Sequence, residues 1–270
     1  MNHRDVIETV SNSLRSDTGI CALFLSGSYA NGLADEYSNI DFVLVAHDGA
    51  TDEIAEACRS AIGQIGEIVL WWDRTTRPSL VNAIVEGWTR IDMLILKPGQ
   101  LALQSQSDLT PLFDHDNLFS DLPVSTKKQG PDPARLRYQF EEFIRILGLL
   151  HLAVGREEYI NGVLGVFHLR NLLVDLLIEE TGAPNRGGVL HLNRLITDEQ
   201  KELLISLPPA VPNLDAMISA HIAYAQVYLP RARKLAGQWG VDWPDRFETV
   251  TWAKLSETLS ISRPYELVRG

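Results

Sequence analysis

Residues Leu25 to Val45 read LSGSYANGLADEYSNIDFVLV and join a turn signal to an apolar strand pattern. The apolar run from Ile20 to Leu25 ends at Ser26-Gly27-Ser28, which indicates a buried strand followed by a tight turn. A short helical turn is expected next, and Ile40 to Val45 forms a second apolar run. The stretch therefore predicts two buried strands joined through a glycine-containing turn.

Gly27 and Ser28 have the chemistry of a phosphate-binding turn. A glycine lets the backbone approach a ligand closely, the amides at the start of a helical turn favour an anion, and Ser28 adds a hydroxyl donor. Asn39 and Asp41 share one face of the following strand because side chains alternate with period two. Such oxygen ligands beside a phosphate are what Mg²⁺ binds, so the pattern predicts a magnesium site.

Asp92 is a lone acid inside the apolar run from Trp88 to Leu96, which is a further predicted strand. Buried carboxylates are rare without a partner. A metal ion would explain this acid, and so would a buried arginine or a strand end in water. The residue alone leaves these explanations open, and the Gly-Ser turn elsewhere favours the metal.

The remaining pattern predicts an α+β chain of two domains. Further strands are expected over residues 67–72 and 110–114, and helices over residues 4–15 and 51–65. Residues 125–133, STKKQGPDP, read as a polar linker. Beyond the linker the apolar spacing is helical, and helices are expected over residues 136–150, 157–180, 198–207 and 213–237, the last with a kink at Pro230. Residues 1–125 are therefore expected to hold a mixed sheet of about five strands, and residues 126–270 an all-α bundle.

The segment 25–45 resembles the signature of the polymerase-β-type nucleotidyltransferase superfamily, in which a Gly-Ser and a spacer precede an acidic pair that opens a strand. Asp92 is similar to the third carboxylate of that signature, on a later strand. In detail the chain looks most like the lincosamide and aminoglycoside adenylyltransferases, which join a head of similar length to a helical C-terminal domain. Residues 111–116 are similar to the strand that closes the head in that group.

The resemblance implies transfer of a nucleoside monophosphate, AMP from ATP, to a hydroxyl of a small molecule such as an aminoglycoside or lincosamide antibiotic. Mg²⁺ would be the cofactor, and the substrate would lie between the two domains. The expected roles are phosphate binding by Gly27 and Ser28, metal binding by Asn39, Asp41 and Asp92, catalysis by Asp41 and Asp92, and further nucleotide contacts by Ser38 and Lys127. For Lys127, a solvated linker lysine is the alternative interpretation.

Asn39 departs from the family pattern, which has an acid at this position. Asparagine offers a neutral oxygen, so weaker metal binding is expected. A second hypothesis is therefore a catalytically impaired nucleotide-binding protein of the same fold. A third is a protein-modifying or toxin–antitoxin transferase, against which the sizeable second domain argues.

The net charge of −11 falls entirely within residues 1–125, which hold 18 acids and 7 bases. An acidic surface disfavours nucleic-acid backbones and suits a metal ion or a cationic partner, although solubility alone would also explain it. No uninterrupted apolar run approaches the roughly 20 residues of a membrane span, and no signal core follows Met1. We therefore expect a cytoplasmic monomer or homodimer with no membrane or nucleic-acid partner.

Overall fold

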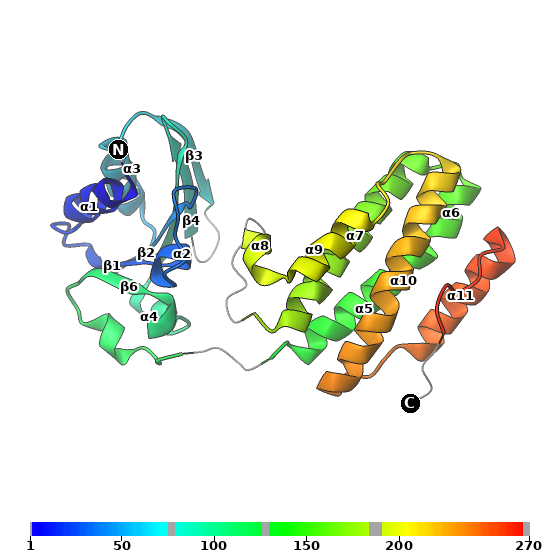
Figure 1. The fold of residues 1–270 in the computed structure, drawn as a ribbon. Coiled ribbons are helices and arrows are strands. Elements are labelled where there is room, and N and C mark those ends of the chain that lie inside the picture. Colours follow the sequence, from blue (N-terminus) through cyan, green and yellow to red (C-terminus); the bar gives the residue numbers. More distant parts are fainter. Residues whose placement is uncertain (1, 75–78, 126–129, 184–190, 267–270) are drawn as a thin grey trace. The chain divides into compact units, whose positions relative to one another are not determined.

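The computed structural model describes residues 2–74, 79–125, 130–183 and 191–266 (Figure 1). The chain divides into two compact units, Met1–Lys127 and Lys128–Gly270. The centre of the predicted linker, residues 126–129, lies outside the described residues. Each unit has buried apolar clusters of its own.

A six-stranded mixed sheet forms the centre of the first unit, with the strand order β3-β4-β5-β2-β1-β6. Only β2 and β5 pair in parallel among these neighbours. The strands are β1 (Ile20–Leu25), β2 (Ile40–Ala46), β3 (Ile68–Arg74), β4 (Ser79–Val85), β5 (Thr89–Leu96) and β6 (Thr110–Asp114). The α+β class and the mixed sheet are confirmed, and β4 is a strand beyond the five that the sequence predicted.

Two helices, α1 (His3–Leu14) and α3 (Asp52–Gly63), lie side by side against one face of this sheet (Figure 1). Both begin at residues suited to a helix start, because the side chains of Asn2 and Thr51 accept hydrogen bonds from first-turn amides. The opposite face has a smaller apolar cluster, which includes Val43 and Val45. The short elements on this side are α4 (Pro98–Leu101), η1 (Gln106–Asp108) and η2 (Leu118–Asp121). The short helix α2 (Gly27–Ala30) follows β1.

The sheet has β3 and β6 at its edges. On β3, Val69 is 61% exposed and Trp72 is 55% exposed. The guanidinium of Arg74 lies over the Trp72 ring, 5.8 Å from its centroid. This edge of the sheet thus presents large apolar side chains to solvent beside the charged end of the strand.

The second unit consists of helices around one apolar core. They are α5 (Pro133–Gly148), α6 (Leu150–Gly155), α7 (Tyr159–Thr181), α8 (Leu192–Leu195), α9 (Asp198–Ser206), α10 (Leu214–Trp239) and α11 (Asp245–Leu259). The rings of Phe143 on α5 and Tyr228 on α10 are stacked, with their centroids 3.7 Å apart. Pro230 lies within α10, as predicted, whereas α11 was not predicted.

Helix α7 has the length and composition of a membrane span, with 23 residues and a mean hydropathy of 1.3. This result differs from the expectation based on uninterrupted apolar runs. In the structure, Leu169, Leu173 and Leu176 of α7 are fully buried in the helical core. A core helix of a globular unit meets the same criteria of length and hydropathy, although only 39% of the apolar window of α7 is buried, and Leu164 and Phe167 are exposed.

Glu248 of α11 is a buried carboxylate, only 2% exposed, and it ties the C-terminal residues to the bundle. It accepts hydrogen bonds from Nη2 of Arg233 at 2.6 Å, from Nε1 of Trp243 at 2.7 Å and from the hydroxyl of Tyr265. Buried acids need such partners, because an unpaired charge in the interior is costly. The Glu248 network therefore links three separate segments of the second unit.

Candidate active site

Asp41 and Asp92 lie side by side near the start of the parallel pair β2 and β5, where their α-carbons are register partners. Asn82 of β4 is in turn the register partner of Asp92. Ile40 and Phe42 face the core under α1 and α3, so Asp41 between them points to the opposite face. The same alternation places Asp92 and Asn82 on that face. The fold thus brings together two acids and an amide from three adjacent strands.

Asn39 connects the two carboxylates. Its Nδ2 donates to Oδ1 of Asp41 at 2.7 Å and to Oδ2 of Asp92 at 2.9 Å. Nδ2 of Asn82 donates to Oδ1 of Asp92 at 2.6 Å. Both oxygens of Asp92 therefore accept a hydrogen bond from an amide, and the sequence analysis had assigned Asn39 but not Asn82 to this site.

The turn after β1 packs directly on Asp41. Gly27 has φ +60°, and a β-carbon at this residue would lie 2.2 Å from Oδ2 of Asp41. The amide of Ser26 donates to the carbonyl oxygen of Asp41 at 2.9 Å. Oγ of Ser28 is buried and has no hydrogen-bond partner among the described residues. The turn thus places a glycine backbone and an unpaired hydroxyl beside the carboxylate pair.

The pKa of Asp41 is raised from 3.8 to about 6. Burial is the largest cause, and the neighbouring charge of Asp92 adds to it. The hydrogen bond from Asn39 and the positive charge of Arg90 act in the opposite direction without cancelling the rise. Two carboxylates in this position repel each other, and a bound cation would relieve that repulsion.

The donor set fits a hard divalent cation. Asp41 and Asp92 supply carboxylate oxygens, and Asn39, Asn82 and Ser28 supply amide or hydroxyl oxygens, which are the ligand types that Mg²⁺ prefers. Oδ1 of Asn82, like Oγ of Ser28, is buried without a hydrogen-bond partner among the described residues. Asn39 directs its nitrogen at both acids, and a half-turn of this amide would direct its oxygen there instead.

The other predicted site residues are placed differently. Ser38 donates from Oγ to Oδ1 of Asp35 at 3.0 Å and accepts from the Asp35 amide at 3.0 Å, so its hydroxyl is used within the 35–38 turn. Lys127 lies outside the described residues. Arg90, which sequence reasoning did not single out, donates to the carbonyl oxygen of Tyr37 at 3.2 Å. A polar residue between the apolar Val81 and Ala83 is the signal that could have identified Asn82.

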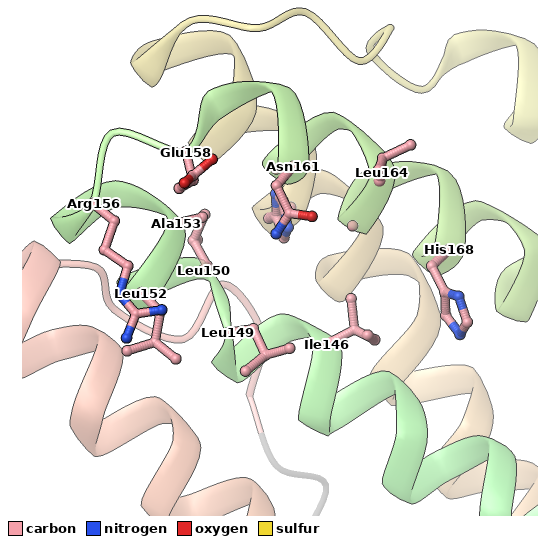
Figure 2. Close-up of a pocket in the computed structure, with 13 residues that line it drawn as sticks. Ile146, Leu149, Leu150, Leu152, Ala153, Arg156, Glu158, Asn161, Leu164 and His168 are labelled. Atoms are coloured by element: carbon pink, nitrogen blue, oxygen red, sulfur yellow. The ribbon is translucent and has the colours of Figure 1, made fainter.

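A separate hollow of about 420 Å³ lies within the helical unit (Figure 2). Ile146, Leu149 and Leu150 line it, while Asn161 and His168 of α7 add polar groups. Arg156 and Glu158 add one charge of each sign to this mostly apolar lining.

Residues 7–77 match the sequence model of the nucleotidyltransferase domain family. This segment includes the Gly27 turn, Asn39 and Asp41, and the match confirms the resemblance of the N-terminal unit to the polymerase-β-type nucleotidyltransferases. No curated protein sequence matches the chain.

Solved structures that are similar to the chain include the following three. An aminoglycoside 6-adenyltransferase from Bacillus subtilis is 13% identical over 93% of this chain and 95% of its own, with a TM-score of 0.43. A spectinomycin adenyltransferase from Enterococcus faecialis, solved with ATP and spectinomycin, is 13% identical over 86% of this chain and 100% of its own, with a TM-score of 0.34. A nucleotidyltransferase-like protein from Exiguobacterium sibiricum is 14% identical over 95% of this chain and 88% of its own, with a TM-score of 0.35.

Proposed function

We propose that the nucleotidyltransferase domain matched over residues 7–77 is active and transfers a nucleoside monophosphate, AMP from ATP, to a hydroxyl of a small molecule. The observation that carries this proposal is the adjacency of Asp41 and Asp92 in register on β2 and β5, with Gly27 packed against Asp41. Acids held side by side beside a glycine turn suit the handling of a triphosphate, because charge neutralisation and positioning supply most of the catalysis in phosphoryl transfer.

Each residue of the site has a role in this proposal. Gly27 allows the backbone to come close to the phosphates, and Ser28 has an unpaired hydroxyl to offer them. Asp41, Asp92 and the amide oxygen of Asn39 would hold Mg²⁺, which when bound supplies positive charge to the phosphates. Asp92 would also accept the proton of the attacking hydroxyl once Asn39 turns its amide away from Oδ2.

A second candidate function is nucleotide binding without transfer. The specific observation in its favour is the position of the Asn39 amide, which donates to both carboxylates and occupies the place between them. The site then carries two negative charges, from Asp41 and Asp92, instead of the three that an acid at position 39 would give. Weak metal binding would leave a nucleotide-binding domain with little or no turnover.

The test is a transfer assay on the full chain. The purified protein is incubated with each of the four nucleoside triphosphates, Mg²⁺ or Mn²⁺, and a panel of aminoglycosides, lincosamides and spectinomycin. Pyrophosphate release and the mass of the acceptor are measured, and we expect a gain of one nucleoside monophosphate on one acceptor class. Asp41→Asn is expected to lower the rate by about 100- to 1000-fold, because a metal-binding carboxylate is lost.

Asp73→Asn, an exposed acid on β3 of the same sheet, is the matched control and should leave the rate unchanged. Equal rates for the wild type and Asp41→Asn would contradict the assigned site. Calorimetric titration with a non-hydrolysable ATP analogue separates the two candidate functions, since Mg²⁺-dependent binding without transfer to any acceptor would favour the second.

A further inference from the structure

Three side chains of different chemistry meet near the start of β1. They are Cys21 of β1, His47 directly after β2 and Asp116 shortly after β6, and their ligand atoms all lie within 4.8 Å of one another. Sγ of Cys21 is 3.3 Å from Nδ1 of His47. The same nitrogen is 4.0 Å from Oδ2 of Asp116. No active-site residue belongs to this cluster.

The strand order fixes the position of the cluster. β1 lies between β2 and β6, so the residue near its start is flanked by the end of both neighbours. The amide of His47 donates to the carbonyl oxygen of Gly19 at 3.0 Å, and the amide of His115 donates to the carbonyl oxygen of Cys21 at 2.8 Å. These backbone bonds fix the main chain at Cys21, at His47 and at the residue before Asp116.

We propose that Cys21, His47 and Asp116 form a binding site for a zinc-class divalent cation. Ligand atoms at about 2.0–2.3 Å from a tetrahedral zinc ion are separated by about 3.3–3.8 Å from one another. The distance from Cys21 to His47, 3.3 Å, lies in this range, and the distance from His47 to Asp116, 4.0 Å, would shorten slightly on binding. A thiolate, a neutral imidazole and a carboxylate together carry two negative charges, which balance a divalent ion. The Cys21 thiol gives its proton to solvent as the sulfur–metal bond forms.

The fourth ligand position would be open. A hollow of about 340 Å³ adjoins the cluster, with His47 and Asp116 in its lining beside His115 and Arg15. Cys21 closes the site from within the sheet, since it is only 1% exposed. A water molecule or a small anion from this hollow can therefore complete a tetrahedral shell.

A Cys-His-Asp catalytic triad is the alternative for these three residues, and the geometry argues against it. In a triad the imidazole contacts the nucleophile and the acid through different nitrogens, whereas here Nδ1 of His47 faces both Cys21 and Asp116.

The Cys21 cluster differs from the Asp41–Asp92 site in its position on the sheet and in the class of cation that its ligands prefer. His47 follows Asp41 by six residues along β2, which corresponds to about 20 Å of extended strand. The Asp41–Asp92 site offers oxygen ligands, which select hard cations such as Mg²⁺. The Cys21 cluster offers sulfur and nitrogen, which select zinc and its neighbours in the transition series.

The test is a cobalt titration of the full chain after treatment with a chelator, because Co²⁺ reports thiolate ligation by a near-ultraviolet charge-transfer band. We expect one equivalent of Co²⁺ to produce this band, Zn²⁺ to displace it and millimolar Mg²⁺ to leave it unchanged. His47→Gln, Asp116→Asn and Cys21→Ser should each weaken Co²⁺ affinity by more than about tenfold, since even supporting residues of metal ligands contribute roughly 10–100-fold.

Matched controls separate this site from general effects. Cys58→Ser removes the other buried thiol, and Asp48→Asn removes an exposed acid next to His47; both should retain the band. His47 and Asp116 are partly exposed, so their variants are expected to fold, which circular dichroism checks. Absence of the band in the wild type, its persistence in all three ligand variants, or its loss only in Cys58→Ser would overturn the proposal.

Discussion

Gly27 lies so close to Asp41 that any β-carbon at residue 27 would fall 2.2 Å from Oδ2 of that carboxylate. The turn and the acid are therefore packed as one unit, and the position of the acid depends on the absence of a side chain at the turn. A positive φ of +60° at Gly27 adds a second reason for glycine.

Gly27→Ala should therefore displace Asp41 and abolish transfer. Gly32→Ala is a matched control, because Gly32 has φ +67° but nothing within 4 Å of a β-carbon. Both variants share a backbone strain of about 1–2 kcal/mol. We expect only Gly27→Ala to lose Mg²⁺-dependent nucleotide binding, measured by calorimetry, and equal losses in both would assign the effect to the strain alone.

The raised pKa of Asp41 predicts a specific pH dependence of stability in the metal-free protein. The folded chain holds the Asp41 proton more tightly than the unfolded chain, so this group contributes a loss of stability as the pH rises from about 4 to about 6. Asp41→Asn cannot ionise and should become more stable relative to the wild type across that range. Melting temperatures of both proteins in a chelator, from pH 4 to pH 7, test this, and a constant difference would contradict it.

The same shift predicts that transfer activity falls below about pH 6, where Asp41 becomes protonated. Saturating Mg²⁺ should move the midpoint of the rate profile to lower pH, because a cation favours the ionised carboxylate. Rate profiles at low and high Mg²⁺ concentration provide the measurement. A midpoint that does not move with Mg²⁺ would mean that Asp41 does not contact the metal.

Asn39→Asp tests the part that the amide plays. The change removes two hydrogen bonds to charged groups, each worth about 1.5–3 kcal/mol, and places a third negative charge between the acids. The free energy of unfolding in a chelator should fall by about 3 kcal/mol or more. Mg²⁺ should then stabilise Asn39→Asp more than it stabilises the wild type.

Urea unfolding with and without Mg²⁺ gives both quantities for this variant. Asn171→Asp, on an exposed position of α7, adds the same charge away from the site and should behave as the wild type. If Mg²⁺ stabilised Asn39→Asp no more than Asn171→Asp, residue 39 would not be a metal ligand.

Glu248→Ala should destabilise the helical unit by about 1–3 kcal/mol, because it leaves the indole nitrogen of Trp243 without its acceptor, while Arg233 keeps Asp245 as a partner. The exposed Glu257 also pairs with a cation, Lys254, and Glu257→Ala should cost less than about 1 kcal/mol. Urea unfolding followed by circular dichroism compares the two. Similar losses would mean that burial does not set the strength of the Glu248 network.

The parts of the site that depend on local sequence could be predicted, and the parts that depend on distant pairing could not. Residues 25–45 carry their own turn and strand signals, so Gly27 and Asp41 were identified directly. Asn82 was missed because its place beside Asp92 depends on the pairing of β4 with β5, although a polar residue within an apolar run marks it locally. The sequence also does not determine which end of the Asn39 amide faces the acids, because the nitrogen donates to carboxylates whereas the oxygen would bind a cation.

The helical unit shows the same division. The spacing of Leu136, Phe140 and Leu147 predicted α5, which begins at the Asp132 cap and Pro133. Helix α11 was missed because polar side chains, Glu248 and Thr251, occupy buried positions beside Trp252 and Leu255. The partners supplied by Arg233, Trp243 and Tyr265 make the burial of Glu248 favourable.

The exposed apolar side chains of β3 affect how the protein behaves at high concentration. An edge strand offers unpaired backbone groups to another chain, and Val69 and Trp72 add apolar surface for such a contact. The charges of Asp73 and Arg74 at the end of the strand oppose this association, as charged residues on edge strands commonly do. Neutralising both would therefore promote aggregation by the folded protein, through strand addition at β3, while the active-site geometry stayed intact.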